Sequence, residues 1–296
     1  MLLQKLADKN LIHPPKFLID NTHFLVRMGS YAYGTTLDTS DCDIYGWCIP
    51  PKEMVFPHLD GEILGFGRQK KRFEQFQQHH IHDESNGWTY DFQIFNIVKY
   101  FDLVMQNNPN LIDSLFVSRQ CVMVSTHIGE LVRENRKVFL HKGAWPKFKG
   151  YSFSQLNSLG VKNPQGKRKD DIDKHGYCTK HAMHLVRLLL EIEQILIEGD
   201  LDLMRHKEQL KAIRRGEWTK EQLVGYFDSK ERELETVYTN SKLPWGPDEP
   251  RIKQILIDCL EMHYGNLEKY VVIPDIATKT IKEIQESIER YKGATQ

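Results

Sequence analysis

The sequence lacks an excess of charge of either sign: lysine and arginine total 40, aspartate and glutamate total 40, and the formal net charge is zero. Such a chain does not bind polyanions through its overall charge, so any contact with nucleic acid must come from a local basic patch. Paired cysteines are also lacking. The five cysteines are scattered and form no C-x-x-C pair, which argues against a disulfide framework or a zinc site.

Long apolar runs are absent as well. The most apolar helical stretch, residues 185–197, is interrupted by Arg187, Glu191 and Glu193, so it cannot span a bilayer. Residues 1–20 alternate charged and apolar side chains and contain no signal-peptide core. From these features we expect a cytoplasmic protein without membrane contact. The 296 residues, 40% hydrophobic and 27% charged, have an ordinary globular composition.

The pattern of the chain changes near residue 125. Before it, strands are expected at 23–28, 43–49, 88–92 and 121–124, a polar ribbon and loop at 58–86, and helices at 93–105 and 111–116. After it, helices are expected at 126–140, 145–159, 175–199, 203–215, 219–240, 248–269 and 276–292, and a mobile loop at 162–174. The sequence therefore predicts an α+β fold. An N-terminal catalytic domain with a mixed sheet and flanking helices (residues 1–125) precedes an all-helical substrate-binding domain (residues 126–296).

Two aspartates, Asp41 and Asp43, open a run that otherwise has the composition of a buried strand. Side chains at positions i and i+2 of a strand point to the same face, with Cα atoms roughly 6.5 Å apart. Two carboxylates this close are unfavourable unless a cation neutralises them, and Mg²⁺ combines one or two carboxylates with substrate phosphates. The pair is therefore a candidate site for a divalent ion, and an exposed turn is the alternative.

Gly29 and Ser30 form the turn that follows the preceding strand. A Gly-Ser turn between a strand and a helix exposes backbone N–H groups and a hydroxyl that can hold phosphate oxygens. Gly34 allows the chain to stay close to a ligand. A phosphate-binding turn followed by a metal-binding strand is the arrangement that phosphoryl or nucleotidyl transfer requires. A Gly-Ser pair alone is a common turn, so the aspartates carry most of this interpretation.

The segment GSYAYGTTLDTSDCDIYG at residues 29–46 resembles the signature of the polymerase-β-type nucleotidyltransferases, in which GS precedes D-x-D and an apolar strand. It is most similar to the RNA-repair-associated branch found in bacteria and phages. The similarity continues in residues 107–116, 148–159 and 179–189, and covers most of residues 25–215. It implies a nucleotidyltransferase fold, two Mg²⁺ ions (Mn²⁺ being an alternative), a bound NTP, and an acceptor that is an RNA 3′ end or a small molecule.

The resemblance also implies a third carboxylate. Asp91, in the run WTYDFQIF, matches that position and would join Asp41 and Asp43 as a catalytic and metal-binding residue. The alternative role for Asp91 is that of a helix N-cap. The nearby run of three histidines and an aspartate at residues 79–83 is more simply a solvated hairpin than a separate metal site.

Further roles follow from the resemblance for the turn and the helices. The nucleotide would be bound by Gly29, Ser30, Gly34, Ser40, Lys180 and Arg187. The substrate would be bound by Lys149, Tyr151, Gln155 and His184. From the residues alone, a solvated helix face fits the stripe of Lys180, His184 and Arg187 better than a binding surface does, and Tyr151 fits an ordinary helix start equally well.

The expected reaction is attack of an acceptor hydroxyl on the α-phosphate of an NTP, with release of pyrophosphate. An RNA acceptor is favoured by the resemblance, whereas the neutral net charge suits a small-molecule or protein acceptor. A non-catalytic nucleotide sensor is a further alternative, but it would not need three carboxylates.

Overall fold

The computed structural model describes residues 1–36, 41–56, 72–160, 167–265 and 284. Within this part, five strands form one sheet. They are β1 (Thr22–Arg27), β2 (Cys42–Cys48), β3 (Gln75–Asp83), β4 (Trp88–Asn96) and β5 (Val122–Ser125). Their order is β3-β4-β2-β1-β5, with β2 and β4 parallel and the other neighbours antiparallel. The parallel strands β2 and β4 begin at the same end of the sheet, so the residues near their starts lie together.

Helices surround this sheet and continue beyond it. The first half contains α1 (Leu2–Asp8), α2 (Lys52–Val55), α3 (Ile97–Met105), α4 (Pro109–Phe116) and α5 (His127–Glu134). The second half contains α6 (Ala144–Asn157), α7 (Lys167–His175), α8 (Thr179–Glu198), α9 (Lys207–Arg214), α10 (Lys220–Asn240) and α11 (Glu249–Tyr264). Short 3₁₀ turns occupy Gly29–Tyr31, Arg119–Cys121 and Arg136–Phe139. None of the described helices has the length and hydropathy needed to cross a membrane.

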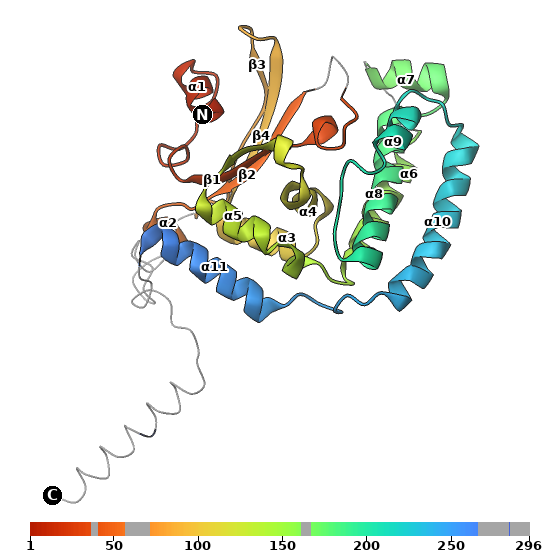
Figure 1. Cartoon of the computed structure of the whole chain (residues 1–296). Helices are drawn as coiled ribbons and strands as arrows, with labels where there is room; N and C mark the ends of the chain where they lie inside the picture. Colours follow the sequence, from red (N-terminus) through yellow and green to blue (C-terminus); the bar gives the residue numbers. More distant parts are fainter. Residues whose placement is uncertain (37–40, 57–71, 161–166, 266–283, 285–296) are drawn as a thin grey trace, which may run out of the picture.

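Alternate residues of the strands point to opposite sides of the sheet, so each face carries its own set of side chains. Apolar side chains on both faces pack against helices. On one face, Ile44 and Phe92 pack with Leu3 and Leu6 of α1. On the other face, a larger cluster begins with Trp47 and runs through α3, α4 and α8 to α11. Figure 1 shows α6, α8, α9 and α10 side by side beyond the sheet, and α11 returning along α5 and α3. The division into domains at residue 125 stays a prediction, since one apolar cluster crosses it.

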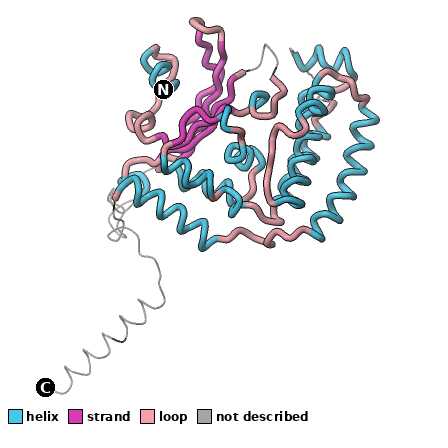
Figure 2. Tube along the Cα trace, in the orientation of Figure 1, coloured by secondary structure: helices cyan, strands magenta, loops and turns pink. Residues whose placement is uncertain are grey.

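The predicted α+β class is confirmed, with strands followed by helices along the chain (Figure 2). The helix predicted at 93–105 begins only at Ile97. Residues 93–96 pair with β2 and residues 93–95 also pair with β3, so two ladders hold this segment extended. The Asn96 side chain caps α3 by accepting the Val98 N–H at 2.9 Å. The helical spacing that begins at Ile94 therefore started one turn too early.

Two further expectations differ from the structure. Residues 167–174 of the predicted loop are helical in α7, where Asp171 accepts a 2.6 Å hydrogen bond from Thr179 of α8. The helix predicted at 126–140 ends at Glu134, because Asn135 closes it and a 3₁₀ turn follows. Helix α1 was not predicted. The helix expected at 276–292 falls outside the described residues apart from residue 284.

Candidate active site

The sheet brings Asp43 and Asp91 side by side near the starts of β2 and β4. They are directly paired residues of the parallel strands β2 and β4, which lie about 4.8 Å apart, and both point to the face that carries Trp47. Burial, followed by the charge of Asp91, raises the pKa of the Asp43 carboxyl, while Lys180 acts in the opposite direction. Two carboxylates are therefore held in partial desolvation, where a cation would stabilise them.

The Gly29–Ser30 turn lies directly against this pair. A Cβ atom added to Gly29 would come 2.0 Å from the Asp43 Oδ2 atom, so no side chain fits between them. Gly29 has φ +62°, and the Met28 N–H donates to the Asp43 carbonyl at 2.7 Å. The turn is closed by the Thr35 N–H, which donates to the Ser30 carbonyl at 2.8 Å. The phosphate-binding candidate and the metal-binding candidate thus touch.

Asp91 is held from the edge strand β3. Its Oδ1 atom accepts a 2.6 Å hydrogen bond from the His80 backbone N–H, and the His79 Nδ1 atom lies 3.6 Å away. Both contacts arise from an irregularity in the β3–β4 register between Gln78 and Ile81, where His80 has φ +55°. Sequence reasoning left His79 in a solvated hairpin. The contact depends on this bulge, and no residue type between Gln78 and Ile81 indicates a bulge in the sequence.

Asp41 precedes β2 and is exposed, and its charge contributes to the raised pKa of Asp43. Ser40 lies outside the described residues. Among the residues that are described, no three His, Cys, Asp or Glu side chains gather into a complete metal site. The protein ligands on offer are thus the Asp43–Asp91 pair with Asp41 beside it, a set that suits an ion whose remaining ligands are water and phosphate.

Helix α8 supplies positive charge opposite the carboxylates. Lys180, in its first turn, is exposed and close enough to Asp43 to lower the pKa of that carboxyl. No carboxylate of the described chain pairs with Lys180. One turn further on, burial, followed by the charges of Arg187 and Lys180, holds the pKa of His184 well below its usual value. His184 is therefore a neutral, half-buried imidazole.

Arg187 lies in a buried ion cluster, which differs from the phosphate contact expected of it. Its Nη1 atom contacts Asp113 of α4 and lies 3.0 Å from Glu191 Oε1, and both carboxylates are almost fully buried. The guanidinium lies over the Tyr33 ring at 4.2 Å, and the Tyr33 hydroxyl donates to Asp113 at 2.7 Å. The cluster joins the segment after Ser30 to α4 and α8, so the structure gives Arg187 a role in holding these elements together.

The residues expected on α6 are divided between two surfaces. Gln155 contacts the His181 ring at 2.8 Å, beside Lys180, and the Tyr151 hydroxyl accepts a 3.2 Å bond from Asn108. Lys149 instead pairs with Glu231 and Glu235 of α10, at 2.8 Å from each. Gln155 thus lies next to the start of α8, whereas the charge of Lys149 is already balanced elsewhere.

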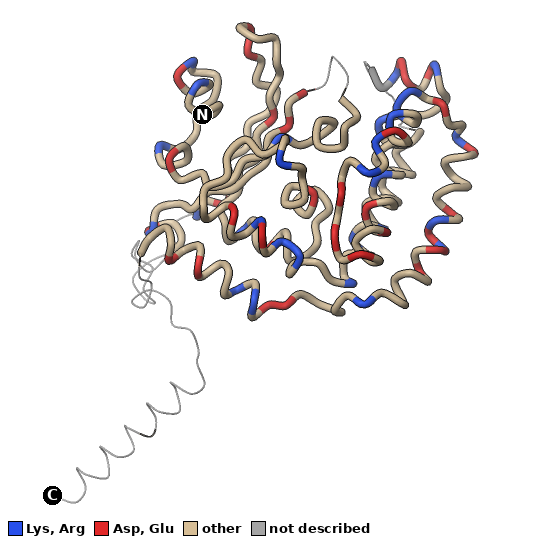
Figure 3. The backbone as a smooth tube through the Cα atoms, in the orientation of Figure 1, with Lys and Arg blue, Asp and Glu red and all other residues tan. Residues whose placement is uncertain are grey.

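A lysine that sequence reasoning missed adjoins the turn. Gly34 has φ +66°, and a Cβ added to it would lie 3.3 Å from the Cβ of Lys207, the first residue of α9. Lys207 is exposed and has no ion pair with any described carboxylate. Figure 3 shows lysine and arginine recurring along α9 and the adjoining end of α8, across from the acidic start of β2. No spacing in the sequence connects residues 34 and 207, so only the fold reveals this contact.

The chain matches known proteins as follows. The sequence profile described as the RNA repair pathway DNA polymerase beta family matches residues 5–244. No curated protein matches the sequence. A search of solved structures returns a nucleotidyltransferase-like protein from Exiguobacterium sibiricum, at 10% identity and a TM-score of 0.29, over 88% of this chain and 72% of that one. Because the matched profile spans most of the chain, the protein belongs to the RNA repair pathway DNA polymerase beta family and is a nucleotidyltransferase.

Proposed function

We propose that the protein transfers a nucleoside monophosphate from an NTP to a hydroxyl group of RNA, with release of pyrophosphate and with the help of a divalent metal. One observation carries the proposal: the Asp43 carboxylate lies against Gly29, beside Asp91 and within the influence of Lys180. This arrangement combines a surface for phosphate, a pair of metal ligands and a balancing cation in one place.

The residues fit a divalent ion. Asp43 and Asp91 are adjacent carboxylates of limited exposure, and burial, followed by the charge of Asp91, raises the pKa of the Asp43 carboxyl, so a cation bound between them would stabilise the charged pair. We infer that Asp43 and Asp91, with Asp41 beside them, would hold Mg²⁺ or Mn²⁺ as a two-ion site. When bound, such ions offset phosphate charge and lower the pKa of a coordinated hydroxyl.

The chain's own residues would bind and orient the reactants. The Ser30 turn is placed to contact the triphosphate, and Lys180 and Lys207, which lack carboxylate partners in the described parts of the chain, would offset its charge. Asp91 would accept the proton of the acceptor hydroxyl. Gln155, next to His181 and the start of α8, is placed to hydrogen-bond the base.

The decisive experiment uses Asp43→Asn. Purified protein is incubated with each of four labelled NTPs, Mg²⁺ or Mn²⁺ and total cellular RNA, and labelled products are sorted by size and by sensitivity to nuclease. We expect wild type to label RNA, and Asp43→Asn to lose at least about a hundredfold in rate, because a key electrostatic group is removed. Mg²⁺ with NTP should also raise the Tm of wild type but not of the variant.

Asp228→Asn is the matched control, since Asp228 is exposed on α10 and its side chain has no partner among the described residues. It should behave as wild type in both assays. An Asp43→Asn protein with full activity would refute the mechanism. Label found on protein or on a small molecule would keep the transfer reaction but replace RNA as the acceptor.

A further inference from the structure

An arginine outside the carboxylate site is held between two aromatic rings. The Arg27 guanidinium, at the end of β1, lies 4.0 Å from the centre of the Tyr31 ring and 4.6 Å from that of the Trp88 ring. Arg27 is half-buried, its Nε atom is buried without a hydrogen-bond partner, and no described carboxylate pairs with it. Arg27 lies close enough to Cys42, the residue between Asp41 and Asp43, to oppose the rise in the pKa of its thiol that burial causes.

This stack lies at the same edge of the sheet as the candidate active site. Tyr31 follows Ser30, Trp88 opens the strand that carries Asp91, and Arg27 pairs with Ile44, which follows Asp43. By strand alternation, Arg27 and Trp88 point to the opposite face from Asp43 and Asp91. A nucleic-acid strand that passes from the carboxylates around this end of the sheet would therefore reach the stack next.

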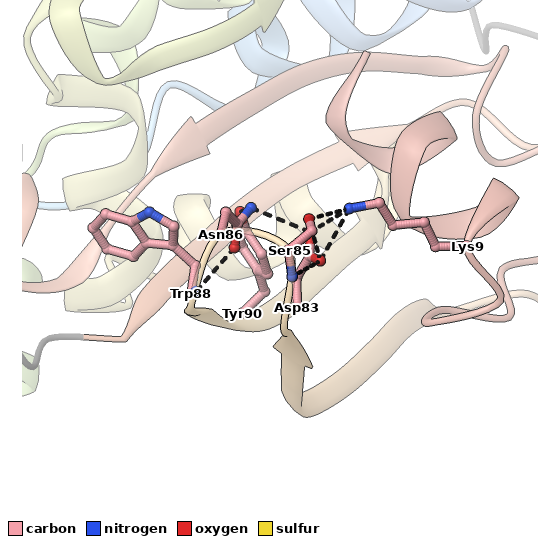
Figure 4. A network of polar contacts seen from close by, with 6 residues as sticks. All are labelled: Lys9, Asp83, Ser85, Asn86, Trp88 and Tyr90. Carbon is pink, nitrogen blue, oxygen red and sulfur yellow. Dashed lines mark hydrogen bonds and ion pairs between the residues drawn. The ribbon is translucent and has the colours of Figure 1, made fainter.

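The backbone of Trp88 is held in place, and the residue is accessible. The Trp88 backbone N–H donates to the Asn86 side chain at 2.9 Å, Asn86 donates to the Tyr90 hydroxyl at 3.0 Å, and the neighbouring Asp83 is bound by Lys9 at 2.8 Å (Figure 4). These bonds brace the β3–β4 turn against α1. The Trp88 side chain nevertheless remains 36% exposed. An exposed indole beside a cation, on a braced turn, is a surface on which a nucleobase can stack.

The energetics favour an anionic, aromatic ligand. A partly desolvated guanidinium without a counter-ion is costly, and ring faces offset this cost only in part. A nucleotide unit supplies both missing partners, a phosphate for Arg27 and a flat base for Trp88. We propose that Arg27, Tyr31 and Trp88 form an acceptor subsite, so that the acceptor is the single-stranded end of a nucleic acid. This rests on the proposed function and specifies its substrate class.

The test measures acceptor use and acceptor binding separately. Rates are determined for a short single-stranded RNA of mixed sequence at fixed NTP, for wild type, Trp88→Ala, Trp88→Phe and Trp245→Ala. Trp245 is a matched control, because it is 71% exposed and also has a lysine over its ring, Lys142 at 4.2 Å. We expect the KM for RNA to rise about tenfold in Trp88→Ala, less in Trp88→Phe, and not at all in Trp245→Ala.

Binding without NTP supplies the second readout. RNA should quench the tryptophan fluorescence of wild type and of Trp245→Ala, but not that of Trp88→Phe. Trp88→Phe retains an aromatic ring, so it can be measured even if Trp88→Ala fails to fold. Arg27→Gln should reduce the salt dependence of RNA binding by the equivalent of about one phosphate contact.

The two proposals fail in different ways. Transfer to RNA with an unchanged KM and an unchanged quench in the Trp88 variants would overturn the subsite and leave the proposed function intact. A quench at Trp88 without any transfer of label would support the subsite and contradict the proposed function.

Discussion

At Gly29 the candidate site tolerates no side chain. The residue combines a positive φ, which favours glycine, with a carboxylate oxygen at the position a Cβ atom would occupy. Both constraints act on the same atom, so the close approach of the turn to Asp43 depends on this glycine.

We therefore expect Gly29→Ala to destabilise the protein by about 1–3 kcal/mol, because the backbone must adopt a strained conformation. Transfer activity should fall about a hundredfold, since Ser30 and Asp43 are displaced from one another. Thermal denaturation and the labelling assay measure the two effects. Gly150→Ala is the control: Gly150 lies inside α6 with nothing within 4 Å of an added Cβ, so the substitution should stabilise by up to about 1 kcal/mol. Equal behaviour of the two variants would contradict this account.

Sequence reasoning reached this residue because strand, turn and D-x-D occur within one short segment. It did not reach the role of Arg187, for a physical reason. Helical spacing places Lys180, His184 and Arg187 on one stripe, but only the packing of α4 decides where along that stripe solvent ends. The exposed lysine and the buried arginine thus carry the same pattern in the sequence.

Among the elements, α8 is positioned by its ion cluster. Asp113 reaches Arg187 from α4, and Tyr33 reaches both from the segment after the Gly29–Ser30 turn. Burial raises the pKa of Tyr45, which follows Asp43 on β2, to about 12, and the charges of Asp43 and Asp113 add to this. Tyr45 is therefore a neutral phenol that senses the charges of both the carboxylate pair and the cluster. The cluster fixes Lys180 relative to the sheet.

Arg187→Met should destabilise the protein by about 3–5 kcal/mol, because it leaves Asp113 and Glu191 buried without a cation. Arg205→Met is the control. It removes the exposed ion pair between Arg205 and Glu198, the last residue of α8, and should cost at most about 1 kcal/mol. Urea denaturation compares the two variants. If Arg187→Met keeps the stability of wild type but loses affinity for NTP, the guanidinium serves the nucleotide directly.

The extents of elements were harder to predict than their existence. The strand at 88–92 was recognised, yet β4 continues to Asn96 because β2 and β3 both pair with it. Residues 167–175 have the polar composition of a loop, and they are helical where α7 contacts the start of α8. In both cases partners distant in sequence decide the conformation, and local spacing does not contain them.

Across the whole molecule, α11 connects the end of the described chain to the sheet. His263 contacts His23 of β1 at 3.0 Å, and the Tyr264 hydroxyl donates to the Pro50 carbonyl. Burial, followed by the charges of His263 and His127, lowers the pKa of His23 to about 4. The fold therefore holds His23 neutral at physiological pH.

This predicts a loss of stability in mild acid. In the unfolded chain His23 takes up its proton near pH 6.5, whereas in the folded protein it does so only near pH 4. The contribution to stability is full above about pH 6.5 and falls as the pH drops towards 4. We expect the Tm of wild type to decrease by a few degrees between pH 7.5 and 5, and His23→Asn to flatten part of that decrease. An unchanged pH profile in the variant would exclude His23 as the cause.

The return of α11 has a consequence for how the chain is made. The His23–His263 contact spans 240 positions, and Ile252 and Ile255 belong to the same apolar cluster as Trp47. During synthesis on the ribosome, the sheet emerges long before the helix that seals this side of it. Until α11 is made, part of the apolar surface of the first half is therefore exposed. A fragment that stops at residue 244, the last position of the family profile, would lack α11 and would leave that surface exposed.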